Sequence, residues 1–350
     1  MTRGFGFRVG ALFFENLMHR DKCLLIINPI SGTPTKERRR VSALTVKKLA
    51  KAGMDVEIRY TEGPGDATKW AADAASKGYL GVIAAGGDGT VNEVATGLIG
   101  SKTALGIIPL GSGNGLGRHL GLTSDISDAI SVIAEKHIHP CDSCSVNGLP
   151  FFCTFGLGFD AAVSEKFAES KTRGLVTYLR SALHEYLTYS PDEYEIEANG
   201  RKVRLKAFIV AVCNASQYGN NAFIAPAASI KDGLVDITIV HADTPLTQAI
   251  FGVDLLTGMV KNNMIIQTLR AKDVRIRKSG EGIAHVDGEP ITIGESMEVK
   301  CHPGNLLIFL RGDKKPFKPL VTPFIYLSRE IGSKLRRILG LGISKKILFL

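Results

Sequence analysis

The 350-residue chain lacks any apolar run of the ~20 residues that a membrane-spanning helix needs. It also lacks a recognisable secretory leader, because Arg8 and Glu15 interrupt the apolar N-terminal stretch and no small-residue cleavage site follows. We interpret residues 1–20 as an accessory N-terminal arm, with Met1 and Met18 both open as the start.

A regular cysteine pattern is also absent. The six cysteines show no spacing typical of a disulfide framework, which indicates a reducing compartment, and we expect a cytoplasmic protein. Cys141 and Cys144 form an isolated CxxC, and His137 and Cys153 nearby make only a weak zinc pattern. We favour ordinary strand residues over a zinc or redox site.

An excess of charge is absent from most of the chain. The net charge is +9, and residues 311–350 account for +8 of it with ten Lys/Arg against two Asp/Glu. The remaining +1 argues against a nucleic-acid-binding body. A basic end on a neutral body indicates a tail that seeks an anionic surface.

The first third of the chain alternates between strand and helix patterns, which predicts a parallel sheet with helical crossovers. Strands are predicted at 23–28, 55–60, 79–85 and 104–110, and helices at 36–52, 65–77, 90–100, 114–120 and 124–136. We therefore predict an α/β nucleotide-binding domain over 21–136.

Four of these strands run into loops of special composition: "NPISG" (28–32), "TEGPGD" (61–66), "GGDGT" (86–90) and "GSGNG" (111–115). Ligands of parallel sheets collect at this edge, outside the carboxyl ends of the strands. The third loop has neither dinucleotide-fold GxGxxG spacing nor a P-loop lysine. Thr90, followed by Glu93, predicts a capping box at the start of the next helix.

After about residue 136 the pattern is mostly strand. Asn199-Gly200 predicts a hairpin. Further strands are predicted at 234–241, 273–279, 284–293, 297–302 and 305–310, with helices near 173–189 and 245–262. We predict a β-sandwich or barrel-like domain over 137–312, with the active site in the cleft between the two domains.

The motifs "NPISG", "GGDGTVNEV", "PLGSGNGLGRHLG", "APAASIKDGLVD" and "HVDGEP" occur in this order. Over 23–310 the chain resembles the diacylglycerol kinase catalytic-domain family, which includes soluble bacterial lipid kinases and the sphingosine and ceramide kinases. The resemblance implies an ATP-dependent, Mg²⁺-using phosphorylation of a lipid hydroxyl.

The resemblance also implies the site residues. Those around the nucleotide are Asn28, Pro29, Ser31, Gly32, Thr61, Gly86, Gly87, Asp88, Gly89, Thr90, Asn92, Gly111, Ser112, Gly113 and Asn114. Asp287 or Glu289 would be the general base. Ser229, Asp232 and Leu234 would hold a structural magnesium ion, through the Asp232 carboxylate and two backbone oxygens. Asp88 suits a magnesium ion on the triphosphate, because magnesium needs carboxylate oxygens.

One departure concerns the fourth loop, where Asn114-Gly115 stands in place of the Asn-Asp of many bacterial diacylglycerol kinases. This version is similar to the sphingosine and ceramide kinases, so diacylglycerol and sphingoid-type acceptors both stay open. The alternatives are an NAD kinase-like enzyme with a soluble acceptor and a catalytically silent, nucleotide-binding, membrane-associated regulator.

The tail, 313–350, contains a basic amphipathic segment. Apolar residues recur there at steps of three and four: Phe324, Leu327, Ile331, Leu335 and Ile338. Lys334, Arg336, Arg337, Lys345 and Lys346 lie largely off that face. Such a helix lies on anionic membranes, which predicts peripheral membrane association; docking of the helix on the enzyme's own core is the alternative. A homodimer also stays open.

Overall fold

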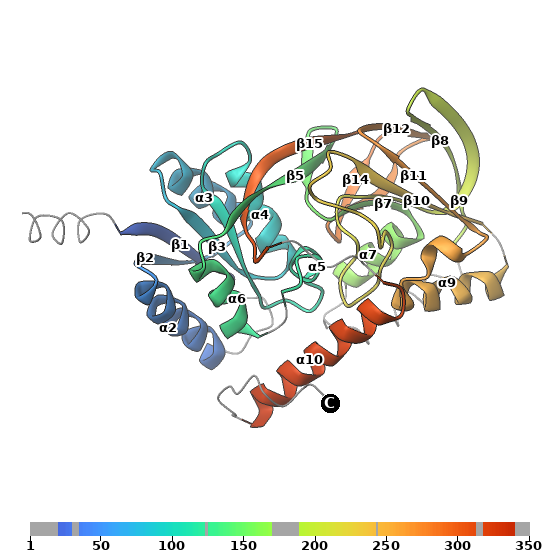
Figure 1. The fold of residues 1–350 in the computed structure, drawn as a ribbon. Helices are drawn as coiled ribbons and strands as arrows, with labels where there is room; N and C mark the ends of the chain where they lie inside the picture. Colours follow the sequence, from blue (N-terminus) through green and yellow to red (C-terminus); the bar gives the residue numbers. More distant parts are fainter. Residues whose placement is uncertain are drawn as a thin grey trace, which may run out of the picture.

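The computed structural model describes residues 20–29, 35–122, 125–169, 189–242, 244–312 and 318–339. They form an α/β lobe and a β-rich lobe (Figure 1). This arrangement confirms the predicted fold class, a parallel-sheet lobe followed by a β-sandwich-like lobe.

A four-stranded parallel sheet in the order β2–β1–β3–β4 forms the centre of the α/β lobe. Its strands are β1 (Asp21–Ile27), β2 (Met54–Tyr60), β3 (Gly81–Gly86) and β4 (Ala104–Pro109). Its helices are α2 (Thr35–Lys51), α3 (Asp66–Ser76), α4 (Asp88–Leu98), α5 (Gly115–His119) and α6 (Ile126–Ala134). Every helix and strand predicted before residue 136 is present.

Helices cover both faces of this sheet, because neighbouring strand residues point to opposite sides. Leu24 and Ile26 of β1 pack in the cluster that contains α3 and α4, whereas Leu25 and Ile27 pack with α2 and α6. Both faces of the strand are therefore apolar, which is typical of a parallel sheet covered on two sides.

The predicted capping box is wrong. Helix α4 begins at Asp88 with Gly87 as N-cap, so Thr90 lies inside the first turn. The carboxylate of Glu93 accepts instead from the backbone N–H of Ala67 at 3.2 Å, in the first turn of α3. The carboxylate that a capping box would use is therefore bonded to α3, whose position the local sequence does not reveal.

The β-rich lobe is mainly antiparallel. Its strands are β5 (Ile138–Val146), β6 (Leu149–Phe151), β7 (Thr154–Gly158), β8 (Asp192–Ala198), β9 (Arg201–Cys213), β10 (Val235–His241), β11 (Ile266–Ala271), β12 (Asp273–Lys278), β13 (Gly282–Val286), β14 (Glu289–Ile293) and β15 (Ser296–Phe309). Its helices are α7 (Phe159–Glu169), α9 (Pro245–Thr257), the 3₁₀ turn η1 (Val260–Asn262) and α10 (Val321–Leu339). The Asn199-Gly200 hairpin between β8 and β9 is confirmed.

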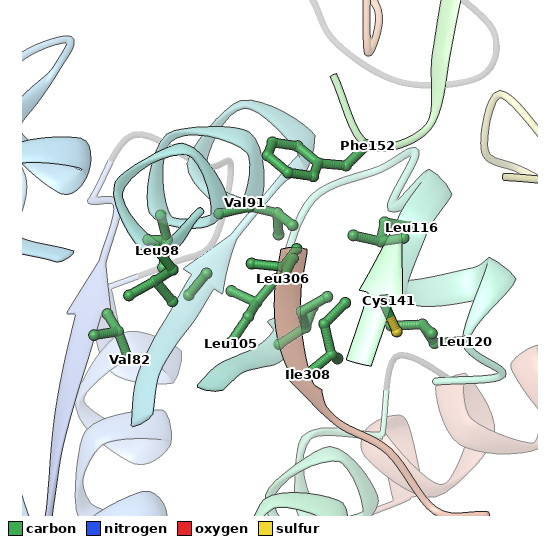
Figure 2. Packing of buried hydrophobic residues seen from close by; sticks show 14 of the residues in the cluster. Val82, Val91, Leu98, Leu105, Leu116, Leu120, Cys141, Phe152, Leu306 and Ile308 are labelled. Atoms are coloured by element: carbon green, nitrogen blue, oxygen red, sulfur yellow. The ribbon is translucent and has the colours of Figure 1, made fainter. Parts of the chain in front are cut away.

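Strand β15 connects the two lobes. It pairs antiparallel with β5 along most of its length, and its end pairs parallel with β4 at Ile308 and Leu105. Figure 2 shows Leu306 and Ile308 of β15 beside Leu105 of β4 and near Val91 of α4. The sheet is continuous from one lobe to the other, so the boundaries after 136 and 312 stay predictions.

Two strand predictions need correction. The single strand predicted over 284–293 is the β13–β14 hairpin, whose turn residues Asp287 and Gly288 have φ of 50° and 88°. The two strands predicted over 297–310 are one strand, β15, with a register shift between His302 and Leu306. The helix predicted near 173–189 falls almost entirely outside the described residues, and the one at 245–262 is α9 followed by η1.

Cys141 and Cys144 behave as ordinary strand residues. Both lie on β5, but Cys141 packs in the core beside α4 and Cys144 in the core of the β-rich lobe. Among the described residues, no group of three His, Cys, Asp or Glu could hold a metal ion.

Helix α10 contains the described part of the amphipathic tail. Its Pro323 is buried, and the ring centroids of Tyr326 and Phe223 lie 6.1 Å apart. Phe324, in contrast, is 71% exposed. The side chains of Leu335, Ile338 and the tail lysines fall outside the described residues. No helix in the described ranges is long and apolar enough to cross a bilayer.

Candidate active site

The predicted loops meet at one edge of the parallel sheet. Asn28 follows β1, Thr61 follows β2, and Gly86 ends β3. The backbone N–H groups of Leu110 and Gly111, after β4, both donate to Gly86 O, at 2.9 and 3.2 Å. The carboxyl ends of all four strands thus present their loops together; Ser31 and Gly32 lie outside the described residues.

The glycines allow the two central loops to touch. A Cβ on Gly111 would lie 2.6 Å from Gly87 Cα, and one on Gly113 would lie 2.8 Å from Asp88 Oδ2. These distances are shorter than real contacts, so any side chain would push the loops apart. Packing of one loop on the other therefore requires these glycines. Because they have no side chains, the N–H groups in the first turn of α4 can be approached by an anion.

Asp88 joins the two loops through its carboxylate. Its Oδ1 accepts from the Gly115 N–H at 2.6 Å and its Oδ2 from the Asn114 N–H at 2.8 Å, at the start of α5. Burial raises the pKa of Asp88 to about 6, and the charge of Asp287 adds to this, against the two N–H donors. Asp88 therefore acts as a cap for α5, and its predicted magnesium role stays a prediction.

Asn114 fixes the turn of the fourth loop. It has a left-handed backbone, with φ of 53°, and its amide exchanges two hydrogen bonds with the Gly111 backbone at 3.0 and 2.7 Å. The next position, 115, is a glycine. A Cβ there would lie only 3.3 Å from the backbone oxygens of Gln217 and Tyr218. The β-rich lobe thus leaves little room for an aspartate at position 115.

Asp287 sits in the β13–β14 turn with both carboxylate oxygens occupied. Oδ1 accepts from the N–H groups of Cys153 and Thr154 at 2.7 and 3.0 Å. Oδ2 accepts from the Phe152 N–H at 3.0 Å and from Asn92 Nδ2 at 2.8 Å. Burial raises the pKa of Asp287, and these four donors oppose the rise. The carboxylate ties the turn to α4 and to the chain before β7.

Glu289, two residues later, has a different environment. Its side chain is exposed, and within the described part of the chain it makes no hydrogen bond or ion pair. Its Oε1 lies 3.5 Å from the point that a Cβ on Gly89 would occupy. A carboxylate of the β-rich lobe therefore faces Gly89, in the first turn of α4 of the other lobe.

Several nucleotide-site residues predicted from the sequence serve neighbouring protein groups. Asn28 Nδ2 donates to Thr90 Oγ1 at 3.1 Å, and Arg38 donates to the Pro29 carbonyl. Asn92 points to Asp287, whereas Ser112 is exposed at the tip of its loop. Their contacts with a nucleotide stay predictions.

The sequence analysis predicts no role for His119, although this residue lies in the "GSGNGLGRHLG" stretch. His119 Nδ1 lies 2.9 Å from Ser216 Oγ and accepts from the Ser216 N–H at 3.0 Å. Both residues are buried. They join α5 to the chain after β9, and the only sequence signal was a histidine inside a glycine-rich helix start.

The corner predicted to bind structural magnesium contains an arginine. Asp232 Oδ1 accepts from the Leu234 N–H at 3.2 Å, while its Oδ2 contacts Arg270. Arg270 Nε lies 3.3 Å from Asp236 Oδ2. Burial raises the pKa of Asp236, and Arg270 opposes the rise. A magnesium ion on Asp232 Oδ2 would compete with Arg270, whereas Oδ1 accepts only one hydrogen bond, and the Ser229, Asp232 and Leu234 ligand set stays a prediction.

Comparison with known proteins gives two matching families. The diacylglycerol kinase catalytic domain matches residues 22–146, and the YegS C-terminal NAD kinase beta sandwich-like domain matches residues 154–310. A "Probable lipid kinase YegS-like" of Klebsiella pneumoniae (strain 342) is 30% identical over 288 residues, 81% of this chain and 94% of the relative. A protein of the same name from Cronobacter sakazakii (strain ATCC BAA-894) is 31% identical over 269 residues, 75% of this chain and 88% of the relative.

Solved structures agree with these matches. A diacylglycerol kinase from Bacillus anthracis str. Sterne superposes with a TM-score of 0.65 at 25% sequence identity. The superposition covers 83% of this chain and 97% of that one. The two-lobed arrangement is therefore shared along nearly the whole length of that enzyme.

Proposed function

Because the chain belongs to the YegS-like lipid kinases of the diacylglycerol kinase catalytic-domain family, we propose that it transfers the γ-phosphate of ATP to the hydroxyl of a diacylglycerol or sphingoid-type lipid. The observation that carries this proposal is the exposed Glu289 carboxylate facing Gly89 of the phosphate loop. The nucleotide belongs to one lobe and this carboxylate to the other, as a two-substrate reaction requires.

The triphosphate would bind at the strand ends, against the first turn of α4. An 11-residue helix begins there, and its N-terminal N–H groups favour anions. Gly86, Gly87 and Gly89 carry no side chain that would block the approach. Asn28 and Thr61, at the ends of β1 and β2, would border the rest of the nucleotide.

Glu289 is the better candidate for the general base. A base must come within ~3 Å of the acceptor hydroxyl and must have an oxygen ready to accept its proton. All four accepting positions of the Asp287 carboxylate are already used, whereas Glu289 has none in use among the described residues. We therefore assign the proton transfer to Glu289. Asp287 holds the β13–β14 turn that carries Glu289 in position.

Magnesium bound with ATP supplies the positive charge that phosphoryl transfer needs. The donor chemistry fits, because each Asp88 oxygen accepts only one hydrogen bond and Glu289 is exposed. Asp88 would hold the ion, directly or through water, while it keeps the two loops in register, and Glu289 stays available as the base.

An anionic membrane surface is the proposed second partner, and the protein would meet it from the cytoplasm as a peripheral enzyme. Phe324, Leu327 and Ile331 of α10 are 71%, 51% and 50% exposed. The Leu320 N–H donates to Thr257 O at 2.9 Å, which joins the start of α10 to the end of α9. The two helices are neighbours (Figure 1).

Helix α9 adds its own outward apolar residues, and the region is basic. Ile250, Val253 and Leu256 are 49%, 60% and 58% exposed. The sequence of residues 311–350 adds a net charge of +8, and a membrane contact needs both apolar and basic residues. Exposure of Phe324, Leu327 and Ile331 supports membrane contact over docking of this part of the helix on the enzyme's own core.

The decisive experiment is incubation of the purified protein with labelled ATP, Mg²⁺ and total membrane lipids, followed by identification of the product by mass. A phosphorylated lipid that disappears with Glu289→Gln supports the proposal. Transfer to NAD under the same conditions would support the NAD kinase alternative. ATP binding without any labelled product would support the silent regulator.

A further inference from the structure

Two buried polar side chains and one partly buried tyrosine lie behind the turn that carries Glu289. Asp160, in the first turn of α7, is 4% exposed, and His285 of β13 is 1% exposed. The Tyr218 hydroxyl donates to Asp160 Oδ2 at 2.6 Å, and His285 Nε2 lies 3.2 Å from the same oxygen. A carboxylate is costly to bury, and these two side-chain partners, with the Ala161 N–H that donates to Oδ1 at 2.9 Å, explain how this site tolerates it.

The partners of His285 define which ring nitrogen donates. The Gly288 N–H, in the β13–β14 turn, donates to His285 Nδ1 at 3.4 Å. Because Nδ1 accepts, Nε2 carries the proton and donates to Asp160. One imidazole therefore connects the buried carboxylate to the backbone of the turn that presents Asp287 and Glu289.

The sheet leaves space for this cluster at one position. Gly156 of β7 faces His285 across the strand pair. A Cβ on Gly156 would overlap both His285 Nε2 and Asp160 Oδ2. The glycine is thus required by the cluster, not by a turn.

Tyr218 connects the same cluster to the loop after β4, residues 111–115. It precedes Gly219, whose φ of 116° is open only to glycine, and a Cβ there would lie 2.9 Å from the Gly113 backbone. The Asn220 N–H donates to Gly113 O at 3.3 Å. The segment that contains Tyr218 therefore packs directly against the loop after β4, residues 111–115.

We propose that Asp160, Tyr218 and His285 are positioning residues that hold the Glu289 turn at a fixed place relative to the Gly113 loop. The cluster touches the turn at Gly288 and the loop through 218–220, so it spans the two sides of the reaction. This inference rests on the proposed function, because Glu289 is taken as the base. None of the three side chains needs to contact ATP or lipid for this role.

The first test is Tyr218→Phe, which removes one hydroxyl and keeps the ring. Displacing catalytic groups without removing them lowers the turnover number, and we expect kcat for lipid phosphorylation to fall about tenfold with KM for ATP unchanged. Tyr79→Phe is the matched control, because the Tyr79 hydroxyl donates to Glu57 at 2.7 Å on the surface of the α/β lobe. Its kcat should equal that of the wild type.

The second test does not require activity. Amide hydrogen exchange over 284–291 should become faster in Tyr218→Phe and in Asp160→Asn, and should stay unchanged in Tyr79→Phe. A kcat within twofold of the wild type for Tyr218→Phe, or unchanged exchange in this segment, would overturn the proposal. If the wild-type protein phosphorylates no lipid, the proposed function fails, and the exchange data alone decide whether the cluster holds the turn.

Discussion

The turns at Asp232-Gly233 and Asp287-Gly288 carry the same dipeptide and neutralise their aspartates by different means. Asp232 is partly exposed and contacts the guanidinium of Arg270. Asp287 accepts four hydrogen bonds, three of them from consecutive backbone N–H groups. A partly exposed side chain binds the first aspartate and backbone N–H groups bind the second, and the second turn is the one that carries an exposed carboxylate, Glu289, toward the other lobe.

The largest expected effect comes from Glu289→Gln. Loss of a general base lowers kcat by about 10²–10⁴-fold, with ATP affinity and melting temperature unchanged. Steady-state kinetics with the identified lipid would measure this. Glu281→Gln is the matched control, because Glu281 is equally exposed just before β13. A Glu289→Gln enzyme with wild-type kcat would return the base assignment to Asp287.

Asp287→Asn should act on stability. An amide replaces one accepting oxygen with a donor that faces N–H groups, and a buried hydrogen-bonding mismatch costs about 1–3 kcal/mol. We expect a clearly lower free energy of unfolding in a denaturant titration, together with lower activity. A fully stable but inactive Asp287→Asn enzyme would contradict the holding role and favour direct chemistry.

The pH dependence of stability tests Asp88, whose carboxyl is influenced by the charge of Asp287. Its pKa in the folded protein, about 6, lies above the ordinary aspartate value of 3.8, so the folded state binds more protons between these values. The free energy of unfolding should fall as the pH rises through this window, by up to about 3 kcal/mol. Asp88→Asn should flatten the profile of the nucleotide-free protein, and an identical slope in both proteins would count against the raised pKa.

The smallest expected effect comes from Arg270→Met, which changes the Asp232 turn and leaves the Asp287 turn intact. Arg270→Met should lower the free energy of unfolding by about 1 kcal/mol, because Arg270 is partly exposed and its ion pairs are screened by solvent. In nucleotide-free protein, Mg²⁺ should leave the melting temperature of the wild type unchanged. A rise with Mg²⁺ that Asp232→Asn abolishes would establish the magnesium site that the family resemblance implies.

Most of the α/β lobe could be predicted from the sequence because its signals are local. The apolar runs of β1 and β3 and the loop glycines fix strand ends, and parallel strands bring those ends together. The 284–293 segment does carry a local hairpin signal, the Asp287-Gly288 pair, and its apolar positions change phase from Ala284 and Val286 to Ile291 and Ile293. The single strand predicted there gave that signal too little weight, and the β13–β14 pairing shows the hairpin.

The site shows the same limit. The sequence left Asp287 and Glu289 as equal candidates because their difference lies in the N–H groups of Phe152, Cys153 and Thr154. Glu93 was assigned to its own helix because its partner, Ala67, is visible only once α3 and α4 pack together. The roles of single carboxylates depended on non-local donors that no local pattern records.

Strand β15 has a mechanical consequence. Because its end pairs with β4 at Ile308 and Leu105 and most of its length pairs with β5, hydrogen-bonded strands run from one lobe into the other. Rotation of one lobe against the other would have to bend the β5–β15 pair or break its contact with β4. We therefore expect the separation between the nucleotide loops and the Glu289 turn to change little, with substrate entry through movements of side chains and loops.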